Sequence, residues 1–374
     1  MTARVARNGA HAAARPERTP LRLGVFTRLV DRVDPAEVYA RGFSLFTTAE
    51  ELGFDVGWVA QHHAHKEGGL PAPLVFLGYV AARTERLRLA TGIITLPLEH
   101  PMRLAEDAAV LDVLSDGRLE LGFGTGGNDV VFSIFERQLA NRQADYEHAF
   151  AIVRDALSGK PLVPDGPVLW PNAERLSSSI WEAAMSVPAA VRAGEHRTRL
   201  LLARTAVRPT LSAGIALNQR QSLGDAQTPL VEAFLSHWTS TDQTPRIGLS
   251  RSIYVAETRA AALADAEAGI RRFAQVAANN RPGFDNARNL SLEELLALAD
   301  VHIGSPAEVI ASLRADPLLS IATDLILQVH PVDPSHAQTL RSLRLIATEV
   351  APALGWRPAR SPKGEVACPS NSSG

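Results

Sequence analysis

Eight short apolar runs alternate along the chain with segments in which apolar residues recur at helical spacing. A run that is apolar at successive positions is typical of a strand buried on both faces, as in a parallel sheet that helices cover. The eight predicted strands are residues 21–26, 55–60, 87–94, 119–122, 180–184, 200–203, 247–255 and 323–329. The helical segments between them predict a succession of β/α units.

Start and stop signals mark several of the predicted helices. The sequence Asp34-Pro35-Ala36-Glu37 supplies an N-cap, a proline at the first helical position and a reciprocal glutamate, and Gly53 ends this helix. Ser305-Pro306-Ala307-Glu308 repeats the start signal before the last strand. Residues 104–111 carry apolar positions on one helical face, and Asp116-Gly117 follows as a stop.

Eight strands joined by helical crossovers favour an α/β fold with a closed eightfold β/α (TIM) barrel, and a doubly wound open sheet is the alternative. We assign one domain to residues 21–355. Two stretches, residues 123–179 and 204–245, are longer than ordinary connections. We expect these insertions to lie over the carboxyl face of the barrel as lids or substrate walls.

Composition limits the classes of function. The net charge of −2, from 38 basic and 40 acidic residues, gives no overall field that would attract nucleic acid or an anionic membrane, so a small-molecule partner is expected. The one cysteine, Cys368, leaves no intrachain disulfide and suits a reducing, cytoplasmic compartment. Residues 1–20 and 356–374 are predicted to be disordered, and a transit peptide is the alternative for the first segment.

Imidazoles directly follow the second predicted strand, in the sequence Gln61-His62-His63. Catalytic side chains collect at the carboxyl ends of parallel strands, because the following loops converge there on one face. Acid/base catalysis by one of these histidines is therefore the favoured interpretation. A metal site that pairs His63 with His65 is an alternative, and so is a rim of hydrogen-bonded histidines without a catalytic role.

Glycine is concentrated after the fourth predicted strand. The sequence Gly122-Phe123-Gly124-Thr125-Gly126-Gly127 fits the dinucleotide pattern GxGxxG, with Asp145 near the offset of a ribose ligand. That fingerprint belongs in the first β/α unit, whereas three units precede this one, so close approach to a flat ring or a phosphate fits better. A tight turn is the alternative. Ser186, which precedes a predicted helix, offers an anion site or a simple cap.

Residues 21–127 resemble the luciferase-like flavin-dependent monooxygenases, which include the alpha subunit of bacterial luciferase, and weaker similarity continues to about residue 350. The order and spacing of several short motifs carry the resemblance. These motifs are Gly53-Phe54-Asp55, His62-His63, Thr91-Gly92-Ile93-Ile94-Thr95-Leu96-Pro97, His100-Pro101, Glu106-Asp107, Leu111-Asp112, Gly117-Arg118-Leu119-Glu120-Leu121-Gly122 and Gly304-Ser305-Pro306-Ala307-Glu308-Val309.

The resemblance implies a barrel that binds reduced FMN at its carboxyl face and uses dioxygen. His62 matches the catalytic histidine of the family, whereas Gln61 replaces the glutamate that is common in the light-emitting subunits. Gly92 and Ile93 match the position of a non-proline cis peptide under the flavin ring, and we predict a cis bond here. The expected pocket residues are Phe26, Trp58, His63, His100 and Asn128, with residues 128–145 as a further wall, and a place in the core is the alternative for the aromatic residues on strands.

The resemblance also indicates how the flavin phosphate is held. Gly124 and Thr125 stand where bacterial luciferase has a reactive cysteine and a phosphate-binding arginine, so the phosphate must be bound differently. Met185 and Ser186 match the phosphate segment of the family, and Gly126 lies beside the glycine turn. Arg142 and Arg204 are the two candidates for the missing positive charge.

The function implied is that of the oxygenase component of a two-component system, which oxygenates a small organic substrate through a flavin hydroperoxide. A separate NAD(P)H:flavin reductase would supply reduced FMN. A homodimer is expected from the family, and a heterodimer is the alternative. A deazaflavin-dependent dehydrogenase on the same fold, a metal-dependent barrel hydrolase and a noncatalytic flavin-binding subunit are the alternatives. The resemblance leaves the substrate open, because specificity resides in variable loops.

Overall fold

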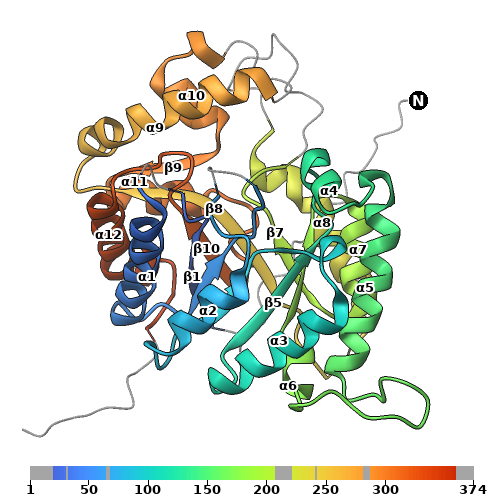
Figure 1. Cartoon of the computed structure of the whole chain (residues 1–374). Helices are drawn as coiled ribbons and strands as arrows, with labels where there is room; N and C mark the ends of the chain where they lie inside the picture. Colours follow the sequence, from blue (N-terminus) through green and yellow to red (C-terminus); the bar gives the residue numbers. More distant parts are fainter. Residues whose placement is uncertain are drawn as a thin grey trace, which may run out of the picture.

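A closed ring of eight parallel strands forms the centre of the molecule (Figure 1). The computed structural model describes residues 20–30, 33–64, 68–206, 221–240, 242–280 and 287–358. The strands are β1 (Arg22–Thr27), β2 (Val56–Val59), β3 (Arg88–Thr91), β5 (Leu119–Gly124), β6 (Ile180–Ala184), β7 (Arg199–Leu202), β8 (Ile247–Val255) and β10 (Asp324–Gln328). The ring closes because β10 pairs in parallel with both β1 and β8. All eight predicted strands and the predicted barrel are confirmed.

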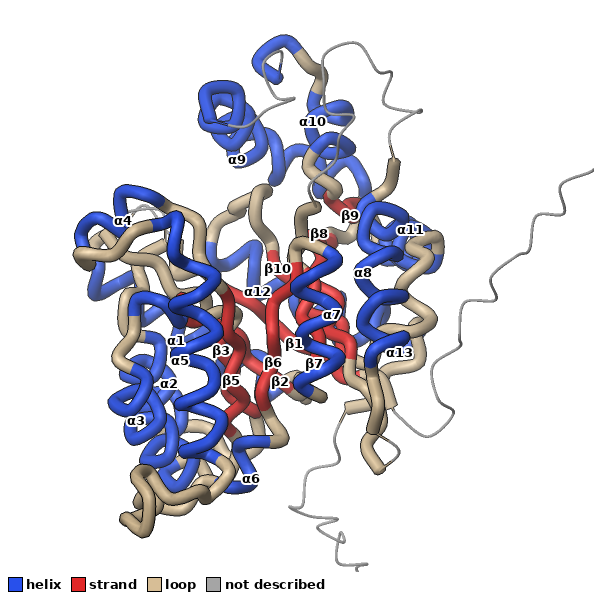
Figure 2. Tube along the Cα trace, turned by 90° about the vertical axis from the view of Figure 1, so that its right-hand side faces the viewer, coloured by secondary structure: helices blue, strands red, loops and turns tan. Residues whose placement is uncertain are grey.

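Helices surround the strands on the outside (Figure 2). They are α1 (Pro35–Glu51), α2 (Pro73–Ala81), α3 (Pro101–Leu114), α4 (Asp129–Ile134), α5 (Arg142–Leu157), α6 (Glu174–Ser177), α7 (Val187–His196), α8 (Leu223–His237), α9 (Arg259–Asn280), α10 (Leu292–Leu298), α11 (Pro306–Arg314), α12 (His336–Leu345) and α13 (Ala351–Ala353). Short 3-10 turns occur at Leu96–Leu98, Leu139–Asn141 and Ala287–Asn289, and Ile346–Val350 is a π-helical turn. None of the described helices is both long and apolar enough to cross a bilayer.

The predicted helix signals act as expected. The Asp34 carboxylate accepts hydrogen bonds from the backbone N–H groups of Ala36 and Glu37, at 2.9 and 3.2 Å. Gly53 has a φ of 84°, the left-handed conformation that ends a helix most easily at glycine. Ser305 and Glu308 form the predicted capping box of α11.

Two short strands interrupt the predicted pattern. The predicted strand 87–94 divides into β3 and β4 (Ile94–Thr95), with Gly92 and Ile93 between them. The sequence analysis missed β9 (Val301–Gly304), which extends the sheet from the end of β8. Together with α9 and α10, β9 stands above the carboxyl face of the barrel (Figures 1 and 2).

The lid prediction for residues 123–179 is wrong for most of that stretch. Only α4, near the carboxyl end of β5, lies at the expected face (Figure 1). Helix α5 packs beside α3 on the barrel wall, because Tyr146, Phe150 and Val153 form a buried face at helical spacing. The loop before α6 lies at the opposite, amino end of the barrel. Within the second predicted lid, α8 packs against α7, and residues 207–220 lie outside the described part.

The packed body extends beyond its predicted end at residue 355. Trp356 is buried, and its Nε1 donates a 2.8 Å hydrogen bond to Oδ2 of Asp55, at the start of β2. Its ring also lies against Phe54. The predicted tail therefore begins later, and residues 1–19 and 359–374 lie outside the described residues.

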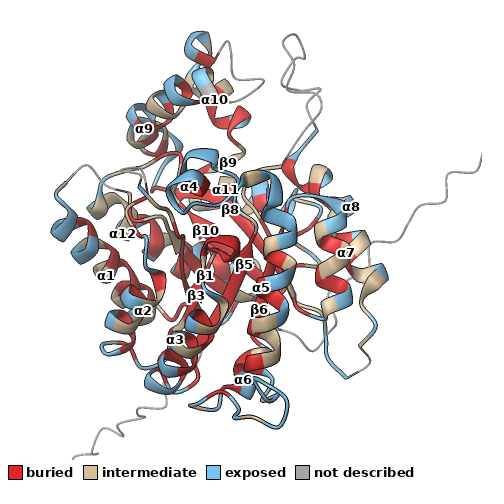
Figure 3. Cartoon of the chain, turned by 45° about the vertical axis from the view of Figure 1, so that its right-hand side comes forward, coloured by how far each residue is buried: buried red, intermediate tan, exposed pale blue. Residues whose placement is uncertain are grey.

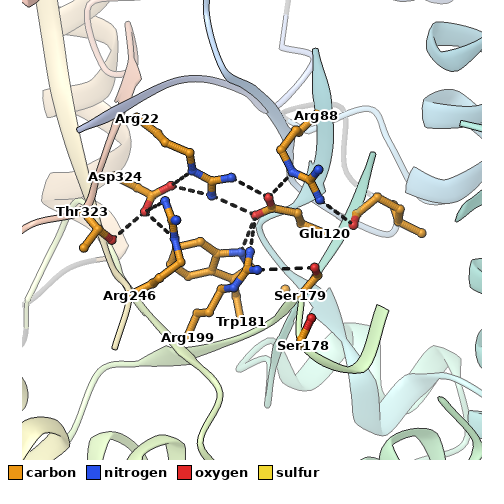
Figure 4. Close-up of polar contacts among 12 residues, drawn as sticks. Arg22, Arg88, Glu120, Ser178, Ser179, Trp181, Arg199, Arg246, Thr323 and Asp324 are labelled. Carbon is orange, nitrogen blue, oxygen red and sulfur yellow. Dashed lines mark hydrogen bonds and ion pairs between the residues drawn. The ribbon is translucent and has the colours of Figure 1, made fainter. Parts of the chain in front are cut away.

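A network of charges closes the amino end of the barrel (Figure 4). Glu120 on β5 accepts hydrogen bonds from Arg22 at 2.7 Å and from Nε1 of Trp181 at 2.7 Å, and it also pairs with Arg88 and Arg199. Burial alone would raise the pKa of Glu120, but the arginines outweigh it and hold this pKa well below its ordinary value. Because this end is sealed, a ligand must enter at the carboxyl end.

Side chains of the next layer are apolar and fill the barrel interior. They are Val56, Trp58, Ala90, Trp181, Leu201 and Ile326. Figure 3 shows the strands buried and the outward helix faces exposed. Small residues, Gly124 and Ala183, stand above the apolar layer, so the carboxyl end keeps room for a ligand.

Candidate active site

A cavity of about 1120 Å³ opens at the carboxyl ends of β1, β2 and β10. Ligand pockets in proteins measure roughly 300–1,000 Å³, so this space holds a cofactor-sized or substrate-sized molecule. Phe26, Arg28, His62, Gln328 and His330 line it from the strand ends. Part of α9 lines the cavity on one side, and residues of α1 and α12 line it on another.

The structure places the predicted catalytic residue, His62, in this cavity. The backbone N–H of His62 donates to the carbonyl oxygen of Leu70 at 3.0 Å, which anchors the strand end to the following loop. Gly68 has a φ of 140°, and a Cβ at this position would lie 2.7 Å from Cγ of His62. The loop therefore needs glycine to pack against the imidazole.

His63 takes a different environment from its neighbour. Its ring lies edge-on against Phe135, with centroids 4.6 Å apart, and burial lowers its pKa. Its Nε2 has no hydrogen-bond partner among the described residues. His65 lies outside the described part of the chain, so the predicted His63–His65 pair is not described. No group of three or more His, Cys, Asp or Glu side chains is arranged to hold a metal ion in the described ranges.

Gln61 connects the end of β2 to the neighbouring strand end. Its Nε2 donates to Oε1 of Glu99 at 2.6 Å, and its Oε1 accepts from the backbone N–H of Thr95 at 2.7 Å. Its own backbone N–H donates to the carbonyl oxygen of Ile93 at 3.3 Å. The side chain is buried. Gln61 therefore fixes the backbone immediately before His62.

The predicted cis bond is present between Gly92 and Ile93. Space around this peptide is limited, because a Cβ on Gly92 would lie 3.0 Å from the Phe26 ring and 3.3 Å from the Trp58 ring. A Cβ on Gly124 would likewise lie 3.0 Å from the Ile93 side chain. Glycine at both positions leaves a smooth floor at the mouth of the barrel, and a flat ring fits such a floor.

The remaining predicted pocket residues lie elsewhere. Trp58 is fully buried below the mouth, with its ring edge-on to Trp181 at 5.4 Å, and it does not line the cavity. His100 is exposed and caps α3, because its Nδ1 accepts the N–H of Arg103 at 3.4 Å. Asn128 is exposed and caps α4 through the N–H of Val131.

The predicted phosphate residues are spread along the other side of the mouth. Met185 and Ser186 are exposed at the start of α7, and the Ser186 side chain makes no capping hydrogen bond. Thr125 donates to the carbonyl oxygen of Gly126 at 3.4 Å. Arg142 is exposed at the start of α5. These residues do not line the cavity beside His62.

Arg204 follows β7 and lies close enough to His330 and Asp333 for its charge to lower both of their pKa values. This arginine therefore belongs to the β10 side of the barrel mouth. It is half-buried.

The sequence analysis missed a chain of contacts that joins Arg28, His330 and Asp333. Nη1 of Arg28 lies 3.1 Å from Nε2 of His330, and Nδ1 of His330 lies 3.0 Å from the Asp333 carboxylate. Arginine only donates, so Nε2 must accept, and the ring proton is on Nδ1 and is donated to Asp333. Burial, with the charges of Arg204 and Arg28, lowers the pKa of His330 to about 4, so the imidazole is neutral at pH 7.

The family model for luciferase-like monooxygenases matches residues 21–317. The chain belongs to this family. Limonene 1,2-monooxygenase of Rhodococcus erythropolis is 24% identical over 315 residues, which cover 81% of this chain and 78% of that protein. The beta chain of alkanal monooxygenase of Aliivibrio fischeri is 33% identical over 105 residues, which cover 28% of this chain and 32% of the relative. Matches to the alkanal monooxygenase chains thus span about a third of those proteins.

Solved structures share the fold. Monooxygenase RslO1 of Streptomyces bottropensis has a TM-score of 0.68 at 24% identity, covering 89% of this chain and 99% of that one. The oxygenating constituent of 3,6-diketocamphane monooxygenase of Pseudomonas putida, solved with FMN, has a TM-score of 0.71 at 17% identity, covering 89% and 98%. A coenzyme F420-dependent reductase of Methanopyrus kandleri has a TM-score of 0.65 at 16% identity, covering 90% and 99%. At these identities the likeness concerns the fold.

Proposed function

We propose that this luciferase-like monooxygenase binds reduced FMN at the carboxyl face of its barrel and uses dioxygen to oxygenate a small organic substrate. The observation that carries the proposal is the position of His62, which lines the cavity together with Phe26, the ring that packs against Gly92 at the barrel mouth. A separate NAD(P)H:flavin reductase supplies the reduced cofactor, so the chain is the oxygenase component of a two-component system.

The residues at the mouth fit a flavin. Gly92, Ile93 and Phe26 support the flat ring, because no side chain projects from the glycine and the two neighbours are apolar. Backbone N–H groups at the start of α7, beside Met185 and Ser186, would bind the phosphate, and Gly124, Thr125 and Gly126 would let the backbone approach it closely. When bound, reduced FMN supplies the electrons that activate dioxygen.

A positive charge is still required for the phosphate. Arg204 acts on His330, at the β10 side of the mouth, whereas Arg142 begins α5, which follows the glycine-rich residues 122–127 and α4 along the chain. Arg142 is therefore the better candidate of the two.

His62 holds or transfers a proton at its imidazole during the reaction. The side-chain amide of its neighbour Gln61 is held by Glu99 and by the N–H of Thr95, so the segment that carries His62 is anchored beside the ring. Residues of α9 line one side of the cavity, so this helix would help to shield a bound ligand from water.

The protein also forms a homodimer through α2 and α3. These helices pack side by side, and five large apolar side chains on them are exposed: Val75, Tyr79, Val110, Val113 and Leu114. An apolar surface of this kind is typical of a subunit interface.

An anaerobic titration tests the choice of cofactor. The protein is titrated under nitrogen with reduced FMN, reduced riboflavin and reduced coenzyme F420, and binding is followed by isothermal titration calorimetry. We expect the tightest binding for reduced FMN and weaker binding for riboflavin, which lacks the phosphate. Tight binding of the deazaflavin, with no binding of FMN, would overturn the proposal in favour of a dehydrogenase.

A further inference from the structure

We propose that Arg28, oriented by His330 and Asp333, binds the carboxylate of the organic substrate, and that the substrate is an apolar molecule with one acidic group. This inference rests on the proposed function for the identity of the cavity as the substrate site. The three residues, Arg28, His330 and Asp333, follow the ends of β1 and β10, which lie side by side because the barrel is closed.

The hydrogen bonds around His330 fix the direction of the arginine. Because Nδ1 donates to Asp333, Nε2 can only accept, and it receives one N–H of Arg28 at 3.1 Å. A neutral imidazole therefore orients the guanidinium without neutralising it. Arg28 also makes at least one further interaction. The proposed carboxylate site therefore depends on where His330 holds the guanidinium charge, and not on unused N–H donors of Arg28.

The charges near His330 favour a monoanion. Arg28 and Arg204 both lower the pKa of His330, and Asp333 is the carboxylate that faces the same ring. Of the described groups that act on the His330 ring, two are guanidinium groups and one is a carboxylate. Among the described residues that line the whole cavity, the formally charged ones are Arg28, Arg41, Arg272 and Asp333. Among these described residues the basic side chains outnumber the acidic one, although the chain as a whole carries a net charge of −2.

Arg28 is better placed for binding than the other two arginines of the cavity. Arg41 pairs with Glu37 one helical turn away, which offsets its charge. Arg272, on α9, has no described partner that holds its long side chain in one conformation. A prearranged guanidinium loses less conformational entropy when it binds a carboxylate, so His330 gives Arg28 the advantage.

The other residues of the cavity indicate that the rest of the substrate is apolar. Apolar side chains from β10, α1 and α12 line its wall, namely Val38, Leu45, Leu327 and Leu343. His62 lines the same space. A carboxylate at Arg28 would thus fix one end of an apolar molecule, and its body would extend along this wall within reach of the catalytic histidine.

Two ligands of the same length and different charge distinguish the effect of charge on affinity from the effect of shape. Octanoate and octanamide have the same chain length, and only the first is an anion. Isothermal titration of the full-length protein is expected to show octanoate binding at least about tenfold more tightly, as a charge-assisted hydrogen bond provides. Arg28→Gln should abolish this preference and leave octanamide binding unchanged, and Arg28→Lys should retain part of it. Arg272→Gln is the matched control and should keep the full preference.

Equal affinity of the wild-type protein for the two ligands, or absence of octanoate binding, overturns the inference. A preference that survives Arg28→Gln overturns it as well. Circular dichroism of each variant shows whether the fold is retained, and Arg28→Lys decides the matter if Arg28→Gln does not fold.

A second titration shows whether Arg28 binds the carboxylate of a substrate or the phosphate of FMN. FMN and riboflavin differ by the phosphate, so loss of the FMN preference in Arg28→Gln would assign this arginine to the cofactor and overturn the inference. An unchanged FMN preference supports it. The octanoate titration needs no flavin, so wild-type protein that binds octanoate selectively but not FMN would support the subsite and refute the proposed function.

Discussion

The side chains of Gln61 and Glu99 share a hydrogen bond of 2.6 Å, from Nε2 to Oε1, directly beside the backbone of His62. The orientation of the amide is determined, because its Oε1 accepts the N–H of Thr95 at 2.7 Å. The family resemblance left the hydrogen bonding of Gln61 open, since light-emitting subunits commonly have glutamate here. In this chain the amide is needed because a carboxylate, Glu99, faces it.

Replacing Gln61 by glutamate is therefore expected to place two carboxylates in contact and to disturb the loop that carries His62. We expect weaker flavin binding and a lower midpoint of thermal unfolding. The double variant Gln61→Glu with Glu99→Gln restores one N–H donor between the two positions and should recover much of both losses. A double-mutant cycle on the unfolding free energy measures this coupling. Additive effects of the two substitutions would show that the pair is not coupled.

Glu120 is expected to be the main stabilising acid at the closed end of the barrel. Glu120→Gln leaves Arg22, Arg88 and Arg199 without their shared carboxylate, and removing one partner of a buried ion pair costs about 3–5 kcal/mol. Urea unfolding measures the change. The exposed pair Arg103–Glu106 offers the control, and Glu106→Gln should change the unfolding free energy little. A similar small effect for both variants would contradict the structural role.

The unfolding free energy is expected to depend on pH through His330. Its pKa is about 4 in the folded protein, against an ordinary value of 6.5, so between these values the unfolded chain binds a proton that the folded protein does not. The unfolding free energy should fall as the pH decreases from 6.5 toward 4. Above pH 6.5 the contribution of the neutral His330 should be fully present. Burial is the main cause of the lowered pKa, the charges of Arg204 and Arg28 add to it, and Asp333 opposes it.

His330→Gln should flatten that dependence in urea unfolding measured at several pH values. The exposed His148→Gln serves as the control for loss of a histidine. His302, whose pKa is also lowered to about 4, acts in the same range, so the difference between wild-type and variant slopes is the quantity to compare. Equal slopes would show that His330 titrates normally.

The exposed face of α2 and α3 is expected to mediate dimerisation. Leu114, on α3, is 69% exposed although it is a large apolar side chain. Leu114→Glu should place a charge in the interface and shift the protein from dimer to monomer in sedimentation-velocity experiments. Leu162→Glu, at an exposed apolar residue outside these helices, is the control and should leave the dimer intact. A wild-type protein that sediments as a monomer would refute the dimer.

Most of the fold could be predicted from local pattern. The eight strands are buried on both faces and therefore read as continuous apolar runs, and the caps at Asp34 and Ser305 are formed by adjacent residues. Strand β9 was missed because it is short, half-buried in part and contains His302. Trp356 was placed in a tail because its partner, Asp55, is far away in the chain.

The candidate site was predictable only in part. His62 and the cis Gly92–Ile93 peptide belong to motifs that lie together in the sequence. The contact between Arg28 and His330 joins residues 302 positions apart, so it becomes visible only when the barrel closes. Inspection of the residues directly after the first and last strands could have singled out both. The capping roles of His100 and Asn128 follow from the helices that begin beside them, which the resemblance did not take into account.

Rapid mixing tests the central claim, that His62 acts at a flavin bound in this barrel. Reduced FMN is bound to the protein under nitrogen and mixed with oxygenated buffer, and the return of oxidised flavin is followed by absorbance. We expect reoxidation on the wild-type protein to be slower than that of free reduced FMN, and its rate to change at least tenfold in His62→Ala while FMN affinity stays the same. Identical time courses for free flavin, wild-type protein and His62→Ala would contradict the account.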